Sequence, residues 1–190
     1  MPNNTYRFLT LWRVASTAEE ITAILKDATD LPRWWPAVYL DVQELEPGDA
    51  DGVGKVVNLY TKGWLPYTLR WQFRVTQNSA PHGFELAASG DLTGRGVWTF
   101  RQDGEQVEIT YLWEVTADKP LLRRLSWLFK PVFAANHRWA MQMGYESLLL
   151  ELARRRAATP EARARVPAPP QPTFARRRRR PGMAAVGDRA

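Results

Sequence analysis

The last long apolar stretch of the chain, Pro120–Arg156, limits the choice of fold more than any other segment. Pro120 fits the first turn of a helix, where a missing N–H loses no partner, and apolar residues follow at helical spacing. Pro131 cannot donate a backbone hydrogen bond and crowds the preceding turn. We therefore expect a break or kink there, followed by a second helix over residues 132–156. The segments before residue 118 have the pattern of short strands, which need this helix to complete a core.

The second part of this helix presents one mostly apolar face. Its members lie three or four residues apart, and they are Phe133, Ala140, Gly144 and Leu148. His137 and Met141 lie beside this face. A glycine in a helix interior costs about 1 kcal/mol relative to alanine, so we expect a large group to approach the helix closely at Gly144.

Apolar and polar residues alternate most clearly over residues 65–76 and 107–115, where the apolar side chains take the odd positions. Such alternation is typical of strands with one buried face. Weaker patterns predict strands near residues 6–14, 38–42, 54–62, 84–88 and 94–101, and Asp103-Gly104 predicts a hairpin turn. A helix is expected over residues 18–26, capped by Ser16 or Thr17, with a short helical turn at 30–36.

The predicted order is thus one strand, two short helices, six strands and a long helix. Short connections make the six strands an antiparallel meander, and a sheet buried on one face must be covered by another element. We expect an α+β fold in which a curved antiparallel sheet of about seven strands wraps around the C-terminal helix. A space then remains between sheet and helix, and its size depends on the curvature of the sheet.

The chain contains no cysteine, which excludes disulfides, thiolate metal sites and a thiol nucleophile. This composition fits a reducing cytoplasm. No apolar run approaches the roughly 20 residues of a membrane span, and the N-terminus lacks the pattern of a signal peptide. We therefore expect a cytoplasmic protein.

The net charge of +6 lies wholly after residue 156, where eight arginines face two acids. This segment is rich in proline, alanine and arginine and has few large apolar residues, so it predicts disorder. The expected division is a folded ligand-binding domain over 1–156 and a disordered tail over 157–190. The run Arg176–Arg180 attracts phosphates of anionic lipid or nucleic acid. The alternative is a solvated terminus without a partner.

Four short segments carry a resemblance to a known family: residues 31–38 (LPRWWPAV), 63–71 (GWLPYTLRW), 90–94 (GDLTG) and 136–141 (NHRWAM). With the order of elements, they resemble the START/Bet v 1-like (SRPBCC) superfamily and its bacterial polyketide cyclase/dehydrase-like branch. The similarity covers roughly residues 5–155. The resemblance implies a helix-grip fold with an elongated, mostly apolar cavity under the long helix, and it implies no shared catalytic set.

His137 is the candidate catalytic residue. A neutral imidazole near the cavity-facing side of the helix has the chemistry of a general acid or base. The alternative is a histidine that holds a partner between helix and sheet. His82 follows Pro81 in a turn and is expected to be exposed. With no cysteine and no second histidine nearby, we expect no metal site and no cofactor.

The candidates for ligand binding are aromatic or polar residues of the strands and the helix. Tyrosine hydroxyls on an apolar face can bind a carbonyl, or the rings can serve as core. Tryptophans can line the cavity or fill it, and Asp91 can point to the cavity or form a turn. The set is Trp35, Asn58, Tyr60, Tyr67, Trp71, Asp91, Trp98, Tyr111, Trp113 and Met141.

Two of the functions left open by the sequence concern the cavity, and a third is an accessory protein whose tail docks it to anionic surfaces. The first is a monomeric protein that binds a small hydrophobic or aromatic molecule in a cavity between sheet and helix. The alternative is a polyketide cyclase/dehydratase-type enzyme acting on an aromatic polyketide-like substrate. In that enzyme His137 would transfer protons while Tyr67 or Tyr111 polarises a carbonyl.

Overall fold

The computed structural model describes residues 5–117 and 120–173 of the 190-residue chain, without the side chains of residues 117–130. The elements, in chain order, are β1 (Thr5–Ala15), α1 (Ala18–Leu25), a 3-10 turn (Ala28–Asp30), α2 (Leu31–Trp34), β2 (Tyr39–Glu46), β3 (Val56–Lys62), β4 (Thr68–Asn78), β5 (Gly83–Gly90), β6 (Leu92–Asp103), β7 (Gln106–Ala117), α3 (Pro120–Arg156) and α4 (Pro160–Arg165).

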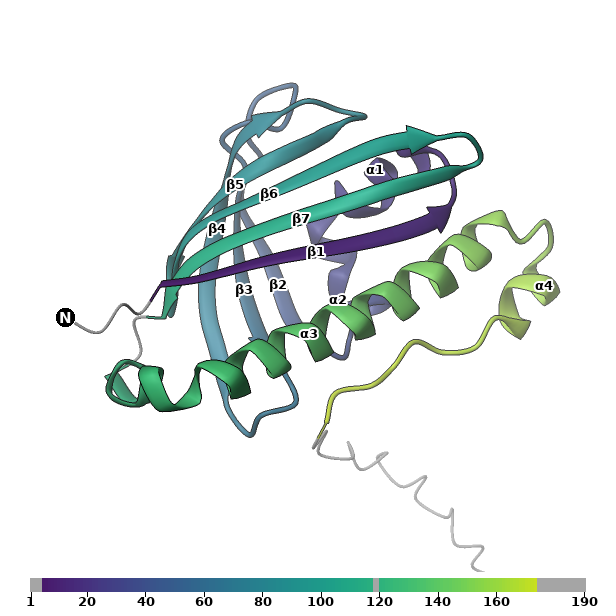
Figure 1. Ribbon diagram of the computed structural model, residues 1–190. Helices are drawn as coiled ribbons and strands as arrows, with labels where there is room; N and C mark the ends of the chain where they lie inside the picture. The colour runs from purple at the N-terminus through teal and green to yellow at the C-terminus, as the bar shows by residue number, and fades with distance from the viewer. Residues whose placement is uncertain (1–4, 118–119, 174–190) are drawn as a thin grey trace, which may run out of the picture.

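The seven strands form one antiparallel sheet in the order β1-β7-β6-β5-β4-β3-β2. Strands β2 to β7 are the predicted meander, and β1 adds to its last strand, with Tyr6 opposite Val115 and Trp12 opposite Ile109. The sheet bends strongly, and α3 runs along its concave side (Figure 1). The predicted α+β helix-grip fold is confirmed.

The odd-numbered aromatic residues of the meander face inward, as their alternation predicts. Trp71, Phe73, Tyr111 and Trp113 are buried, whereas their neighbours Arg70, Gln72 and Arg74 are exposed. Burial of each such side chain away from water stabilises the folded protein by about 1.5–3 kcal/mol. The core of the protein is therefore the space enclosed by the bent sheet, closed by α1, α2 and the second half of α3.

Helix α3 differs from the prediction at Pro131. A single helix runs from Pro120 to Arg156 with Pro131 inside it, so the expected separation into two helices is not found. Proline removes one hydrogen bond and disturbs one turn. The turns on either side keep their own bonds, and the helix continues through this position.

Gly144 makes the close approach that its position in the helix predicts. A Cβ atom built on Gly144 would lie 2.2 Å from Cζ2 of Trp35, so the indole rests directly on the helix backbone. A second close approach joins Gly63, after β3, to the side chain of Asn136 on α3. The backbone N–H of Leu65 donates to Asn136 Oδ1 at 3.2 Å. These two contacts fix the distance between α3 and the elements around it.

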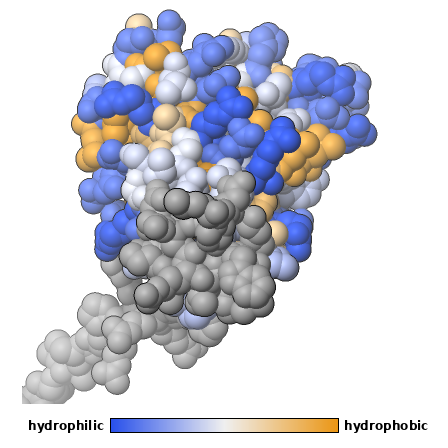
Figure 2. All heavy atoms as spheres, turned by 60° about the vertical axis from the view of Figure 1, so that its left-hand side comes forward, coloured by the Kyte–Doolittle hydropathy of each residue, from blue (hydrophilic) through white to orange (hydrophobic). Residues whose placement is uncertain are grey.

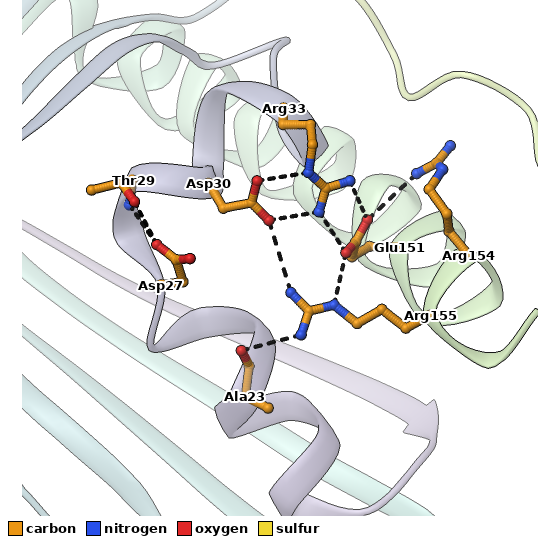
Figure 3. Close-up of polar contacts among 8 residues, drawn as sticks. All are labelled: Ala23, Asp27, Thr29, Asp30, Arg33, Glu151, Arg154 and Arg155. Atoms are coloured by element: carbon orange, nitrogen blue, oxygen red, sulfur yellow. Dashed lines mark hydrogen bonds and ion pairs between the residues drawn. The ribbon is translucent and has the colours of Figure 1, made fainter. Parts of the chain in front are cut away.

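A buried carboxylate fastens the other end of α3 (Figure 3). The side chain of Glu151 is 2% exposed and accepts hydrogen bonds from both terminal nitrogens of Arg33, at 2.9 and 2.6 Å. Arg155 Nε donates to the same carboxylate at 2.7 Å, and Arg33 also binds Asp30. Burial alone would raise the pKa of Glu151, but the hydrogen bonds from Arg33 and Arg155 outweigh burial and lower it. The charged network joins α2 to the last turns of α3.

Residues 157–173, for which the sequence predicts disorder, follow a defined path. Thr159 caps α4, and the chain then runs back beside α3 (Figure 1). Arg154 donates to the carbonyl of Pro167 at 2.8 Å, and Thr173 donates to the carbonyl of Gly63 at 3.3 Å. Hydrogen bonds from side chains to backbone carbonyls, between this segment and the folded domain, thus hold a proline-rich segment that buries little apolar surface of its own. Residues 174–190, with the arginine run, lie outside the described residues.

The visible surface mixes hydrophilic residues with separate hydrophobic areas (Figure 2). The most exposed large apolar side chains of the described residues include Leu9 and Leu11, which point outward from β1. In the part of the chain that the structure describes, none of the helices has the length and apolar character to cross a bilayer.

Candidate functional site

A pocket of about 150 Å³ lies between the inner face of the sheet and α3. The residues around it come from strands β1, β2, β3, β4, β6 and β7, from the segments before β2 and β4, and from one side of α3. They are Tyr6, Phe8, Trp35, Val38, Tyr39, Thr61, Lys62, Gly63, Tyr67, Leu69, Trp71, Leu92, Tyr111, Trp113, Val115, Phe133, Asn136, His137, Ala140 and Met141.

The wall of the pocket is mainly aromatic. The rings of Trp71 and Trp113 are 5.5 Å apart between centroids, and Tyr111 stacks on Trp113 at 5.7 Å. The indole N–H of Trp71 donates to Thr61 Oγ1 at 3.0 Å, so both polar groups are satisfied within the wall. Such a surface suits a flat apolar molecule.

The structure brings seven of the predicted site residues together around this pocket: His137, Trp35, Tyr67, Trp71, Tyr111, Trp113 and Met141. They come from α3, from β4 and β7, from the residue before β4 (Tyr67) and from the residue after α2 (Trp35). The alternation that leads into β4 and runs through β7, and the helical spacing in α3, were sufficient to place all of them but Trp35 on facing surfaces.

Asn58 and Tyr60 do not reach the pocket. On β3 the inward positions belong to Val57, Leu59 and Thr61, which are buried, so Asn58 and Tyr60 point to the outer face. The guanidinium of Arg70 lies 4.3 Å from the ring centroid of Tyr60 on that face.

Asp91 and Trp98 also lie away from the pocket. The backbone N–H of Asp91 donates to the Arg70 carbonyl at 2.9 Å, and the backbone N–H of Arg70 donates to Asp91 Oδ2 at 2.8 Å. Asp91 thus binds the backbone of β4 from the bend between β5 and β6. Trp98 faces inward, but it stacks on Tyr111 at 4.0 Å and contacts Trp12, so it fills the core beyond the pocket.

His137 faces the pocket and packs on β1. Its ring stacks on Phe8 with a centroid distance of 4.2 Å and an angle of 14°. Burial, helped by the charge of neighbouring Arg138, lowers the pKa of His137 to about 4. The imidazole is therefore neutral near pH 7. Its Nε2 atom is buried and has no hydrogen-bond partner among the described residues.

Four tyrosines belong to the pocket lining, and they are Tyr6, Tyr39, Tyr67 and Tyr111. Burial raises the pKa of each: that of Tyr67 reaches about 12, with a further contribution from Tyr6, and that of Tyr111 lies well above its usual value. All four phenols are thus neutral at ordinary pH. They can donate or accept hydrogen bonds without bringing a charge into the pocket.

The sequence did not single out Tyr6, Phe8, Tyr39 or Asn136 as site residues. Tyr6 and Phe8 carry a usable signal, because they share the inward parity of Trp12 on the first strand. Tyr39 and Asn136 carry none, since their places depend on how the chain turns after α2 and on the contact with Gly63.

The C-terminal segment reaches the rim of the pocket. Gly63, whose carbonyl accepts from Thr173, is part of the pocket lining, and so is Lys62, whose amine donates to the Thr173 carbonyl. The described residues contain no group of three or more histidine, aspartate or glutamate side chains placed to hold a metal ion.

Comparisons with known proteins agree on the fold. The chain is similar to the Zhui aromatase/cyclase from a Streptomyces species, with a TM-score of 0.67 and 17% identity over 81% of this chain and 97% of that one. A Thermus thermophilus protein gives a TM-score of 0.62 with 14% identity over 77% and 99% of the two chains. A START superfamily protein from Mycobacterium smegmatis gives a TM-score of 0.52, with 16% identity over 72% of this chain and 98% of that one. No protein-family model and no curated protein sequence matches the chain.

Proposed function

We propose that this protein, whose fold is that of the START/Bet v 1-like superfamily, binds a small hydrophobic or aromatic molecule in the pocket between the sheet and α3. The observation that carries the proposal is an aromatic-walled space of about 150 Å³ with only a few polar groups in its lining. An apolar cavity of about this size in another protein binds benzene. The expected ligand therefore has one or two rings.

Naphthalene is a suitable first ligand because it is flat and lacks polar groups. Its binding should change the fluorescence of Trp35, Trp71 and Trp113, which line the pocket. Ala140→Phe places a ring in the pocket and is expected to reduce naphthalene affinity at least tenfold, as measured by fluorescence titration. Ala153→Phe, at an exposed position of the same helix, is the matched control and should bind as the wild type does.

Equal naphthalene affinity in the wild type and in Ala140→Phe, with both proteins folded, would place the bound molecule elsewhere and contradict the proposal. A wild-type protein that gives no fluorescence change and no heat of binding with naphthalene, with naphthol or with the methyl ether of naphthol would contradict it as well.

The second candidate is a cyclase/dehydratase-type enzyme. It is supported by the buried Nε2 of His137 beside the phenols of the pocket, and by the likeness to a protein named aromatase/cyclase. Two features favour binding over catalysis. An imidazole with a pKa of about 4 is a weak base near pH 7. A space of about 150 Å³ is also smaller than the pockets of about 300–1,000 Å³ that hold larger ligands.

The remaining expectations complete the proposal. The binding domain corresponds to residues 1–156, and the protein acts as a monomer in the cytoplasm. The run Arg176–Arg180 gives the end of the chain an affinity for anionic lipid or nucleic acid that falls as salt rises.

A further inference from the structure

Three buried polar atoms of residues in the pocket lining have no hydrogen-bond partner among the described residues: Nε1 of Trp35, the hydroxyl of Tyr6 and Nε2 of His137. Tyr6 and His137 share an aromatic neighbour, Phe8. The side chain of Tyr6 is only 7% exposed. Nearly all buried polar atoms in native proteins are hydrogen-bonded. An unpaired atom beside a pocket therefore indicates that its partner comes from what the pocket holds.

Tyr6 and His137 belong to one end of the pocket. The ring of Phe8 stacks on His137 at 4.2 Å and on Tyr6 at 6.0 Å. Phe133, one turn before His137 on α3, packs edge-on against Tyr6 at 5.9 Å. The four rings form a rigid aromatic frame between β1 and α3, and the two polar atoms are held in it. Tyr67 is also near, since the phenol of Tyr6 contributes to the raised pKa of Tyr67.

In the free protein, an ordered water can satisfy such atoms. A ligand that fills the pocket displaces this water, and it loses affinity unless it replaces the hydrogen bonds. Discrimination of this kind is strong when a site is built to bind a hydroxyl, because the analogue without the hydroxyl leaves buried protein groups unpaired.

A hydroxyl is the group that fits both atoms. The neutral imidazole carries its proton on one nitrogen only, so Nε2 is either a donor or an acceptor. A hydroxyl serves in both cases, because it donates and accepts. An ether oxygen only accepts.

We propose that Tyr6 and His137 form a hydroxyl-binding subsite, so that the preferred ligand is a small aromatic alcohol or phenol rather than a plain hydrocarbon. This inference rests on the proposed function of the pocket and names its ligand class.

Three molecules with one ring skeleton test it: naphthalene, naphthol and the methyl ether of naphthol. Isothermal titration calorimetry with the full-length protein gives their affinities. Naphthol is expected to bind at least tenfold more tightly than naphthalene, a difference of about 1.4 kcal/mol. The methyl ether should bind less tightly than naphthol, because it cannot donate a hydrogen bond.

Two variants assign the preference to the subsite. Tyr6→Phe and His137→Phe keep a ring at each position, and each is expected to reduce naphthol affinity several-fold while naphthalene affinity stays within about twofold. Tyr60→Phe removes a hydroxyl from the outer face of the sheet and is expected to change neither affinity. Thermal unfolding of each variant confirms that it is folded.

The outcomes separate the two proposals. Tight binding of naphthalene with no advantage for naphthol would overturn the subsite and leave the binding function standing. A naphthol preference that persists in both Tyr6→Phe and His137→Phe would also overturn the subsite. Absence of binding by all three molecules would overturn both.

Discussion

The imidazole of His137 ties the stability of the protein to pH. Burial lowers its pKa to about 4, against about 6.5 in an unfolded chain. Between these values the unfolded state binds a proton that the folded state excludes. The free energy of unfolding therefore falls as pH decreases through this window. From about pH 7.5 to about pH 4.5, the expected loss through this one group is on the order of 2–3 kcal/mol.

Replacement of His137 by phenylalanine should remove this loss, because the ring remains stacked on Phe8 without a titrating nitrogen. Urea denaturation at the two pH values measures the effect. His82→Gln, at the exposed second histidine, is the control and should lose stability as the wild type does. Glu20, whose pKa a hydrogen bond from Arg156 lowers to about 2, loses its contribution only as pH falls below about 4.5. An equal loss in His137→Phe and the wild type would contradict the prediction.

The success of residue-level prediction depended on the clarity of the alternation. In β4 and β7, polar residues fill the outward positions, so Trp71, Tyr111 and Trp113 could be placed inside from sequence alone. In β3 the outward positions hold Asn58 and Tyr60, and the inward ones include Thr61. Polarity does not separate the two faces there. Whether a polar group has a partner, as for Tyr6 and His137, depends on three-dimensional contacts and carries no sequence signal.

Helix α3 depends on the carboxylate of Glu151 for its attachment to α2. Glu151→Gln keeps the shape of the side chain but removes the charge that Arg33 and Arg155 share (Figure 3). Both arginine side chains are more than a third exposed, so water can partly solvate them in the variant. We expect a loss of about 2 kcal/mol in the free energy of unfolding.

Urea denaturation also measures this change, and Glu146→Gln provides its control. Glu146 lies on the same helix and accepts a hydrogen bond from Gln142 at 3.0 Å on the exposed side. Its replacement should change stability by less than about 0.5 kcal/mol. Similar effects of the two replacements would show that the buried network adds nothing beyond a surface contact.

The order and type of the elements could be predicted from sequence, and their ends and continuity less well. The capping box of Thr17 and Glu20 marks the start of α1 in the sequence and in the structure. Pro131 predicts a break, yet the helix continues, because one missing hydrogen bond does not outweigh those of the neighbouring turns. The course of residues 166–173 was not predictable, since backbone groups of distant segments, such as the carbonyl of Gly63, hold it in place.

At the scale of the whole molecule, the C-terminal segment connects the end of α3 to the loop between β3 and β4. A chain that ends at Arg165 lacks the hydrogen bonds from Thr173 to the carbonyls of Gly63 and Trp64. We expect faster amide hydrogen exchange over residues 63–67 in this truncated protein, because local opening of the loop costs less free energy.

A chain that ends at Thr173 is the matched control and should exchange as the full-length protein does. The turn at Asp103 and Gly104, in a hairpin of β6 and β7, is an internal reference for unchanged regions. Equal exchange over residues 63–67 in both truncated proteins would show that the segment rests on the domain without stabilising the loop.

The existence of a space between sheet and helix could be predicted from the order of the elements, but its size could not. The volume depends on how far the sheet bends and on two close approaches, Gly63 to Asn136 and Gly144 to Trp35. Both are properties of the folded chain. The aromatic side chains gather in the buried core between sheet and helix.

Gly144 allows the outline of the pocket to be changed from a distance. The indole of Trp35 is part of the pocket wall and rests on a position that has no side chain. Even a methyl group at residue 144 would displace that indole. The shape of the pocket would then change, although residue 144 is not part of its lining. One small substitution at a position outside the pocket lining could thus change the shape of the pocket, while all of the residues that line it stay the same.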